Sequence, residues 1–505
     1  MSINYAIRDR TSARKICDEG RGNREGRIVN SKAAKSLEID RGIMSIATEL
    51  ATRICDLQYG DLPAQAVNSA KIAILDTLGV ALAGSREEAT TIVQRTVHSG
   101  ANGPCLIYGG NHRTNCLDAA LINGTAAHVL DFDDCSNTLG GHPSAPILPG
   151  LLALAEVINA GGTEVLLAYI IGFETEARIA RGVNFHHYQK GWHPTATLGI
   201  FGAAAACGRL LKLSPERVAT ALALCVSMAA GVKANFGTMT KSLHIGQCSR
   251  NGVFAALLAS EGFTANPEAF EHNQGFLNVF NGPGTFDAEK ILEQWADPLD
   301  IVDPGLAIKQ YPCCGSTHPA IDAAIKIVGM HRIDLRQVSQ IDVWIHSRRL
   351  EHTNRPSPRT ALEAKFSVQY CVARALMHGK VVLEHFEGIA FREPEALRIT
   401  QLVHAAPYND VQFDPANHFG GEVTVGVTDG TQYSAKVQNA SGRTFENPLS
   451  DAQLKAKFES CAGRVLSAEQ VGSLYQSIRS FEDLQSIREL TSQMASLAPV
   501  QRSAK

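Results

Sequence analysis

The sequence lacks the features that mark nucleic-acid-binding and membrane proteins. Aromatic residues make up only 6% of its 505 residues, and 47 Lys and Arg against 50 Asp and Glu leave a net charge of −3. There is no basic excess to neutralise phosphates, so we expect no nucleic acid partner. No uninterrupted apolar run approaches the ~18–20 residues of a membrane-spanning helix, so we expect a soluble protein with no membrane partner.

The cysteines also lack a pattern. None of the twelve belongs to a C-x-x-C pair, whereas small secreted domains carry regular disulfide frameworks. We therefore expect a reducing compartment: the cytoplasm, or the mitochondrion in a eukaryote. Residues 1–43 hold ten Lys and Arg against six Asp and Glu and lack the apolar segment of a signal peptide, so we interpret them as a disordered extension.

Several cofactor motifs are missing. The chain contains no G-x-G-x-x-G after a strand, no G-x-x-x-x-G-K-[ST] and no G-x-S-x-G, which removes the usual support for dinucleotide, nucleoside triphosphate and nucleophile-elbow sites. It has no H-E-x-x-H, and its only close cysteine pair, Cys313-Cys314, is adjacent rather than spaced for an iron–sulfur cluster. We expect neither a cofactor nor a metal.

Apolar residues follow a helical period from Met44 to about residue 300. One stripe runs through Ile72, Leu75, Leu78 and Leu82. Small residues are frequent in this region, and they allow helix backbones to approach closely in a buried bundle.

The pattern changes after Pro304. Residues 341–345 alternate as in a strand, 361–377 is typical of a helix, and 423–427 and 433–437 flank an Asp-Gly hairpin turn. Helical spacing returns beyond Pro448, with Ser450 and Ser467 as N-caps. We predict a mainly α protein with an α+β component. A large all-helical domain is built from both chain ends (44–304 and 439–500), and a smaller α+β lid domain is inserted between them (305–438).

One segment concentrates ionisable side chains. Asp131-Phe132-Asp133-Asp134 ends one expected helix, and a glycine-containing loop leads to His142 before the next. Such a loop can hold an imidazole near carboxylates that orient it and raise its basicity. The alternative is a helix end with solvated carboxylates and a surface turn.

Other candidates are weak when taken singly. His193, between Trp192 and Pro194, has the setting of a satisfied core histidine, and Lys241 lies in a loop where lysines are usually solvated. Lys309 lies near the expected domain junction, where ligand sites are common. Cys313 and Cys314 suit packing better than covalent catalysis, because no spacing specifies a base for them.

Together and in this order, the motifs resemble the MmgE/PrpD family, which includes 2-methylcitrate dehydratase, cis-aconitate decarboxylase and iminodisuccinate epimerase. The resemblance runs from about residue 44 to 497. Its marks are Leu75-Asp76-Thr77-Leu78-Gly79, Asp131-Phe132-Asp133-Asp134, His142-Pro143-Ser144, Gly172-Phe173-Glu174, Gly191-Trp192-His193, Lys241, His244-x-Gly246, Arg250-Asn251-Gly252, Lys309-x-Tyr311-Pro312-x-Cys314 and Lys365-Phe366-Ser367.

The resemblance implies a homodimer with an active site in the cleft between a helical domain and an α+β lid. It implies that this site is built on seven residues: His142, His193, Asp131, Lys241, Lys309, Tyr311 and Lys365. Our hypothesis makes His142 the principal acid or base and Asp131 the group that orients it. His193 would assist proton transfer or bind a substrate oxygen, and the lysines and Tyr311 would bind the substrate.

The chemistry suits these residue types. A proton α to a carboxylate is weakly acidic, so moving it requires a positioned acid or base and cations that stabilise the developing negative charge. We expect a cofactor-independent lyase that dehydrates or decarboxylates a small di- or tricarboxylate such as 2-methylcitrate or cis-aconitate. Two alternatives stay open: an epimerase of an iminodisuccinate-like dicarboxylate, and a catalytically silent helical interaction protein of the same fold.

Overall fold

The computed structural model describes residues 44–97, 102–414, 417–443 and 447–496. The predicted extension at residues 1–43 lies outside this range. The predicted fold class is confirmed: most of the described chain is helical, and the strands form one two-stranded and one four-stranded sheet.

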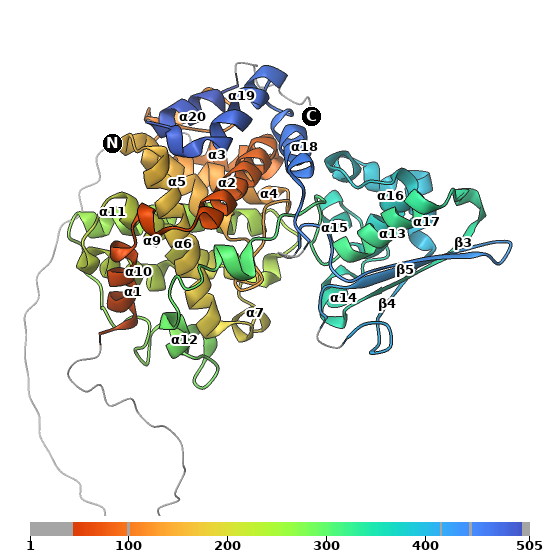
Figure 1. Ribbon diagram of the computed structural model, residues 1–505, viewed down its shortest axis with the longest axis horizontal. Helices are drawn as coiled ribbons and strands as arrows, with labels where there is room; N and C mark the ends of the chain where they lie inside the picture. Colours follow the sequence, from red (N-terminus) through yellow and green to blue (C-terminus); the bar gives the residue numbers. More distant parts are fainter. Residues whose placement is uncertain (1–43, 98–101, 415–416, 444–446, 497–505) are drawn as a thin grey trace, which may run out of the picture. The chain divides into compact units, whose positions relative to one another are not determined.

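The helical part, drawn from both ends of the described chain, has its own hydrophobic core, which takes residues from Ile46 to Ile301 and again from Phe458 to Met494. Figure 1 shows the C-terminal helices lying beside α2 and α5. Its elements are α1 (Ile46–Asp56), α2 (Ala64–Gly84), α3 (Glu88–Val97), β1 (Cys105–Leu106), β2 (Arg113–Thr114), α4 (Cys116–Val129), α5 (Ser144–Ile158), α6 (Gly162–Val183), α7 (His186–Gln189), α8 (Pro194–Thr197), α9 (Gly199–Leu210), α10 (Pro215–Met228), α11 (Thr240–Ser260), α12 (Glu289–Leu292), α18 (Asp451–Ala462), α19 (Ala468–Arg479) and α20 (Ile487–Gln493).

The α+β part has a second core, which takes residues from Tyr311 to Ala435. Its sheet has the strand order β4-β3-β5-β6, with β3 parallel to β4 and antiparallel to β5. In Figure 1, α13 and α16 lie on the same face of this sheet. The elements are α13 (His318–Met330), β3 (Val338–Ile345), α14 (Ser347–Thr353), α15 (Ala361–Ala364), α16 (Val368–His378), α17 (Pro394–Gln401), β4 (Val403–Pro407), β5 (Gly421–Val427) and β6 (Gln432–Val437).

Residues from Met44 onward form one compact unit that contains both cores, so the domain boundaries remain a prediction. The predicted hairpin is confirmed, with Gly430 at φ 90° in the turn between β5 and β6. Ser450 and Ser467 cap α18 and α19 as expected. The single helix expected over 361–377 is wrong: the Ser367 side chain accepts a hydrogen bond from the Tyr370 N–H and begins a new helix, α16.

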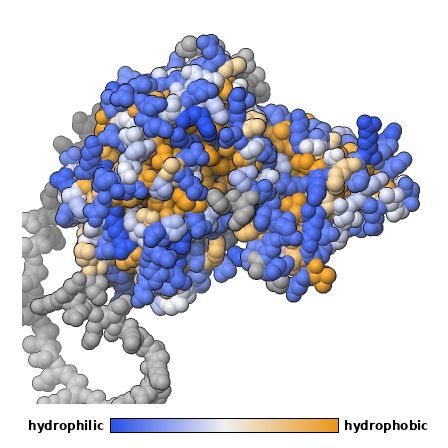
Figure 2. Space-filling model, in the orientation of Figure 1, coloured by the Kyte–Doolittle hydropathy of each residue, from blue (hydrophilic) through white to orange (hydrophobic). Residues whose placement is uncertain are grey.

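The helix α2 is an exception to the expectation that no segment is long and apolar enough to span a membrane. By length and composition, α2 could cross a membrane, but 72% of its apolar window is buried inside the protein. The core helix of a soluble protein has the same property, so this is weak evidence for a membrane span. Figure 2 shows hydrophobic residues on this face in separate patches between hydrophilic ones.

A close helix crossing positions the candidate site. A Cβ on Gly124 of α4 would meet the Gly246 Cα of α11 at 2.9 Å, and a Cβ on Gly246 would meet the Leu121 carbonyl oxygen at 2.2 Å. Only glycine permits this approach on both helices. The crossing brings the end of α4, which carries His128, beside the start of α11, which carries Lys241.

Candidate functional site

Asp131 lies at the centre of the site, between two lysines. The Lys241 Nζ donates to Asp131 Oδ1 at 2.6 Å, and the Lys309 Nζ donates to Asp131 Oδ2 at 3.0 Å and to its backbone oxygen at 2.7 Å. Burial alone would raise the pKa of the Asp131 carboxyl, but the two ammonium groups hold it well below its usual value. Asp131 has φ 54°, a left-handed conformation that is uncommon outside glycine.

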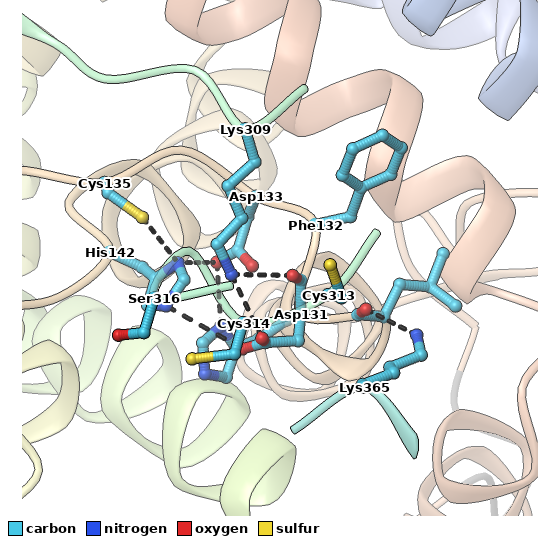
Figure 3. A network of polar contacts seen from close by, with 12 residues as sticks. Asp131, Phe132, Asp133, Cys135, His142, Lys309, Cys313, Cys314, Ser316 and Lys365 are labelled. Carbon is cyan, nitrogen blue, oxygen red and sulfur yellow. Dashed lines mark hydrogen bonds and ion pairs between the residues drawn. The ribbon is translucent and has the colours of Figure 1, made fainter. Parts of the chain in front are cut away.

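Lys309 reaches this site through a short backbone pairing. The Cys135 N–H donates to the Ala307 carbonyl at 2.7 Å, and the Ala307 N–H donates to the Cys135 carbonyl at 2.9 Å. This bridge holds the segment that leaves the helical part against the Asp131 loop. Figure 3 shows the Lys309 ammonium group pointing at Asp131 as a result.

Asp133 joins two histidines. Its Oδ2 lies 2.7 Å from His128 Nδ1 and 3.2 Å from His142 Nδ1. Asp131 Oδ1, in contrast, lies 3.9 Å from His142 Nε2. The structure thus assigns to Asp133 the orienting contact that the sequence analysis expected of Asp131.

His128 is a neutral imidazole. Burial, the largest effect, and the Lys241 ammonium lower its pKa to about 3. Its Nε2 accepts from the Lys241 Nζ at 2.9 Å, so the proton resides on Nδ1, which donates to Asp133.

His142, in contrast to His128, is protonated. Burial would lower its pKa, but the Asp133 carboxylate and the Cys135 thiolate raise it to about 10. The Cys135 Sγ lies 3.9 Å from His142 Nδ1 (Figure 3), and although burial would raise the thiol pKa, His142 and Lys309 lower it to about 6. At neutral pH, His142 is therefore an imidazolium, able to donate a proton from Nε2.

His193 lies farther along a row of imidazoles. The ring centroids of His142 and His128 are 4.7 Å apart, those of His128 and His193 5.5 Å apart, and those of His193 and His244 5.5 Å apart. The His193 Nδ1 lies 3.3 Å from the His244 Nδ1. Burial and the neighbouring cationic groups keep the pKa of His193 well below its usual value, so it is neutral.

The two remaining candidates are placed differently. Lys365 donates to the Leu130 backbone oxygen at 2.6 Å and thus contacts the Asp131 loop from the α+β part. The Tyr311 hydroxyl donates instead to Asp322, within the α+β part, and has no hydrogen bond to this cluster among the described residues. The structure therefore brings together Asp131, His142, Lys241, Lys309 and Lys365, with His193 one ring away, and leaves the Tyr311 hydroxyl outside.

A cavity of about 340 Å³ opens beside the cluster. Its lining includes His128, Asp131, Lys241 and Lys365. His142 does not line it and lies beside Cys135 instead, with 12% of its side chain exposed, more than any group with which it pairs. The cavity is therefore lined by only part of the cluster, and the imidazolium is not in that part.

Three groups could together hold a metal ion. Among the described residues, His128, Asp133 and His142 are the one set whose ligand atoms lie close enough, within 4.8 Å of one another. Ligands bonded at 2.0–2.1 Å to a tetrahedral zinc would lie roughly 3.3 Å apart. The 2.7 Å distance from His128 Nδ1 to Asp133 Oδ2 is that of a hydrogen bond, so the arrangement suits proton sharing better than metal binding.

Sequence reasoning missed His128 and His244. His128 lies inside an apolar helical run, where a histidine looks like a core residue, and His244 was noted only as part of a motif. The spacing of His244 from Lys241, one helical turn, could have indicated that both face the same site.

Fold and site together define the class: an enzyme with a buried site of imidazoles, ammonium groups and carboxylates equipped for proton transfer. The chain belongs to the MmgE/PrpD family, because the MmgE/PrpD N-terminal domain matches residues 48–289 and the MmgE/PrpD C-terminal domain matches residues 311–482. It is a lyase of that family, as the motifs predict.

Several relatives bear the name cis-aconitate decarboxylase. The chain is 30% identical to cis-aconitate decarboxylase of Homo sapiens over 473 residues, covering 90% of this chain and 96% of the relative. It is 29% identical to the Mus musculus enzyme of that name, covering 89% and 93%. It is 25% identical to the Aspergillus terreus enzyme, covering 88% and 95%.

Proposed function

We propose that the chain is a cofactor-independent lyase of small di- or tricarboxylates, with cis-aconitate as the first substrate to test. The observation that carries this proposal is the His142 imidazolium, held by Asp133 beside the Asp131–Lys309 pair. The names of the relatives support decarboxylation within this class.

Decarboxylation needs an acid of this kind. When the bond between a carbon atom and its carboxyl group breaks, carbon dioxide leaves and the electron pair stays on the substrate carbon. The His142 Nε2–H then donates its proton to that carbon, and solvent reprotonates the imidazole. Dehydration would use the same acid to protonate the departing hydroxyl group.

The lysines support this step electrostatically. Two ammonium groups around one carboxylate leave a net positive charge at Asp131. That charge, in a site with little exposed surface, stabilises negative charge as it develops on the substrate.

One observation favours epimerisation as the second candidate. Epimerisation begins with a base that removes an α-proton, and His193 is neutral and can accept one. The His142 imidazolium would return a proton to the opposite face.

The test is a panel of citrate, 2-methylcitrate, cis-aconitate and iminodisuccinate, followed by proton NMR in heavy water. We expect cis-aconitate to lose carbon dioxide and gain one deuterium. Deuterium incorporation without loss of water or carbon dioxide would indicate epimerisation. No change in any of the four would argue for a catalytically silent protein.

A pH–rate profile tests the role of Asp133. The folded-state pKa of His142 is raised to about 10, so its acid form is present below that pH and is lost as the pH rises through it. The raised pKa also stabilises the folded protein. This contribution to the free energy of unfolding is full below pH ~6.5 and is lost as the pH rises toward 10. Asp133→Asn removes the carboxylate, so the alkaline limb of kcat should move down by about 1–3 pH units.

The matched control for that profile is Asp56→Asn, because Asp56 is exposed at the end of α1. Its profile should coincide with that of the unmodified chain. An alkaline limb left in place by Asp133→Asn would contradict the assignment.

We also propose a homodimer and a cytoplasmic location. The family resemblance supports the first, and the eleven described cysteines, all free, suit a reducing compartment. Light scattering on the purified protein measures the mass of the assembly, and cell fractionation tests the location.

A further inference from the structure

Two arginines near the candidate site lack a carboxylate partner in the part of the chain that the structure describes. Arg349 on α14 and Arg443, which follows β6, form no ion pair with any described residue. Their guanidinium groups lie 4.5 and 5.0 Å from the centre of the same ring, that of Phe419. Both guanidinium groups therefore lie against one ring, and neither pairs with a carboxylate of the described residues.

The turn at Gly315 places this pair beside the candidate site. A Cβ on Gly315 would lie 3.6 Å from Arg443 Nη1 and 3.8 Å from Lys309 Cε, so the guanidinium group and the lysine stem flank the same glycine. The next residue, Ser316, lies 3.4 Å from Arg349 Nη1 through its Oγ. Figure 3 shows Ser316 in the same group of side chains as His142 and Lys309.

The hydrogen bonding of the pair is incomplete. The Arg349 Nε donates to the His418 carbonyl and its Nη1 donates to Ser316, but its Nη2 has no described partner. The Arg443 Nε is buried and makes no hydrogen bond. A buried donor of a charged group without a partner is costly, as is the proximity of two like charges.

The pKa of Arg349 reflects how close the two guanidinium groups are. Burial, the largest effect, and the neighbouring Arg443 lower the pKa of Arg349 to about 9. A carboxylate between the two groups would remove the repulsion and accept from the free nitrogens, and the guanidinium fork suits a carboxylate with two parallel hydrogen bonds.

Lys241 and Lys309 cannot fill this role fully, because both are paired with Asp131, and Lys365 donates to the Leu130 backbone oxygen. A substrate with several carboxylates needs a cation for each group that does not react. The arginine pair lies near Lys309, across Gly315, and neither arginine lines the cavity that Lys365 lines.

We propose that Arg349 and Arg443 bind a carboxylate of the substrate remote from the reacting carbon, and so select substrates that carry at least two carboxylates. This inference rests on the proposed function and deepens it. The two arginines bind and position the substrate, and His142 carries the chemistry.

The test compares Arg443→Gln with Arg348→Gln. Arg348 is the exposed neighbour of Arg349 on α14 and is not part of the proposed subsite. The probe is propane-1,2,3-tricarboxylate, which has neither a double bond nor a hydroxyl group to react, and its dissociation constant is measured by calorimetry. We expect Arg443→Gln to weaken binding by about 10- to 100-fold. Arg348→Gln should change it less than about twofold, and Arg443→Lys should retain part of the affinity.

Thermal unfolding without ligand separates binding from structure. If Arg443 serves to bind an anion, removing its charge should leave Tm unchanged or raise it, because its repulsion with Arg349 disappears. A clear drop in Tm for Arg443→Gln would overturn the inference by making the residue structural.

The remaining outcomes distinguish this inference from the proposed function. If Arg443→Gln binds the tricarboxylate as tightly as the unmodified chain while that chain turns over a polycarboxylate, the subsite is rejected and the function stands. If binding depends on Arg443 but no compound of the panel reacts, the subsite stands and the proposed activity is rejected. If the unmodified chain does not bind the tricarboxylate, the subsite is rejected, and turnover of the panel decides the function separately.

Discussion

Replacing His142 with alanine should lower turnover by about 10²- to 10⁴-fold, the range that a positioned acid or base contributes. The imidazolium is the one group of the cluster that combines a raised pKa with an exposed edge, at 12% of its side chain. Without it, the substrate carbon must take its proton from water, while the lysines continue to hold their charge. The loss should therefore appear in kcat, measured by the rate of product formation under saturating substrate.

Two controls make this result specific. His404→Ala changes an exposed histidine on β4 and should leave kcat within about twofold of the unmodified chain. The affinity of His142→Ala for propane-1,2,3-tricarboxylate should stay within about tenfold, because the arginines remain. Undiminished turnover in His142→Ala would reject its role.

Replacing Asp131 with asparagine should lower the free energy of unfolding by about 3–5 kcal/mol, the cost of leaving a buried charge without its partner. Two ammonium groups, on Lys241 and Lys309, lose their common carboxylate. Asparagine has nearly the same shape and tolerates the left-handed backbone of this residue, φ 54°, so the change isolates charge from geometry. Denaturant unfolding followed by circular dichroism measures the difference.

The same substitution has a second consequence. A polycarboxylate can replace the missing negative charge, so propane-1,2,3-tricarboxylate should raise the Tm of Asp131→Asn more than it raises the Tm of the unmodified chain. Asp56→Asn, at an exposed position, should change the unfolding free energy by no more than about 0.5 kcal/mol. Equal stability of Asp131→Asn and the unmodified chain would show that the ion pairs contribute nothing net.

Local patterns predicted most of the regular structure. The helical stripe through Ile72 and Leu82 lies in α2, and the alternation around Asp429-Gly430 forms the hairpin of β5 and β6. The strand β4 was not predicted, because apolar and polar residues do not alternate regularly over Val403–Pro407 and the segment ends in proline. It forms because β3 offers a free edge, and a partner strand is invisible to local spacing.

The candidate site was also predicted only in part. Asp131, His142, Lys241, Lys309 and Lys365 were proposed from the sequence, and they meet in one cluster. Tyr311 was proposed with them, but its hydroxyl turns toward Asp322. The contact with Asp322 depends on how α13 packs, which no motif around Tyr311 records.

The sequence by itself determined which kinds of groups this protein can use: imidazoles, ammonium groups and carboxylates in a chain of helices with an inserted sheet. Only the tertiary structure decided which carboxylate serves which partner. Asp131 and Asp133 are two residues apart in an irregular loop, where no period relates side chains to a face. The left-handed turn at Asp131 and the backbone pairing of Cys135 with Ala307 direct Asp131 to the lysines and leave Asp133 to the histidines, so the proton is stored on His142.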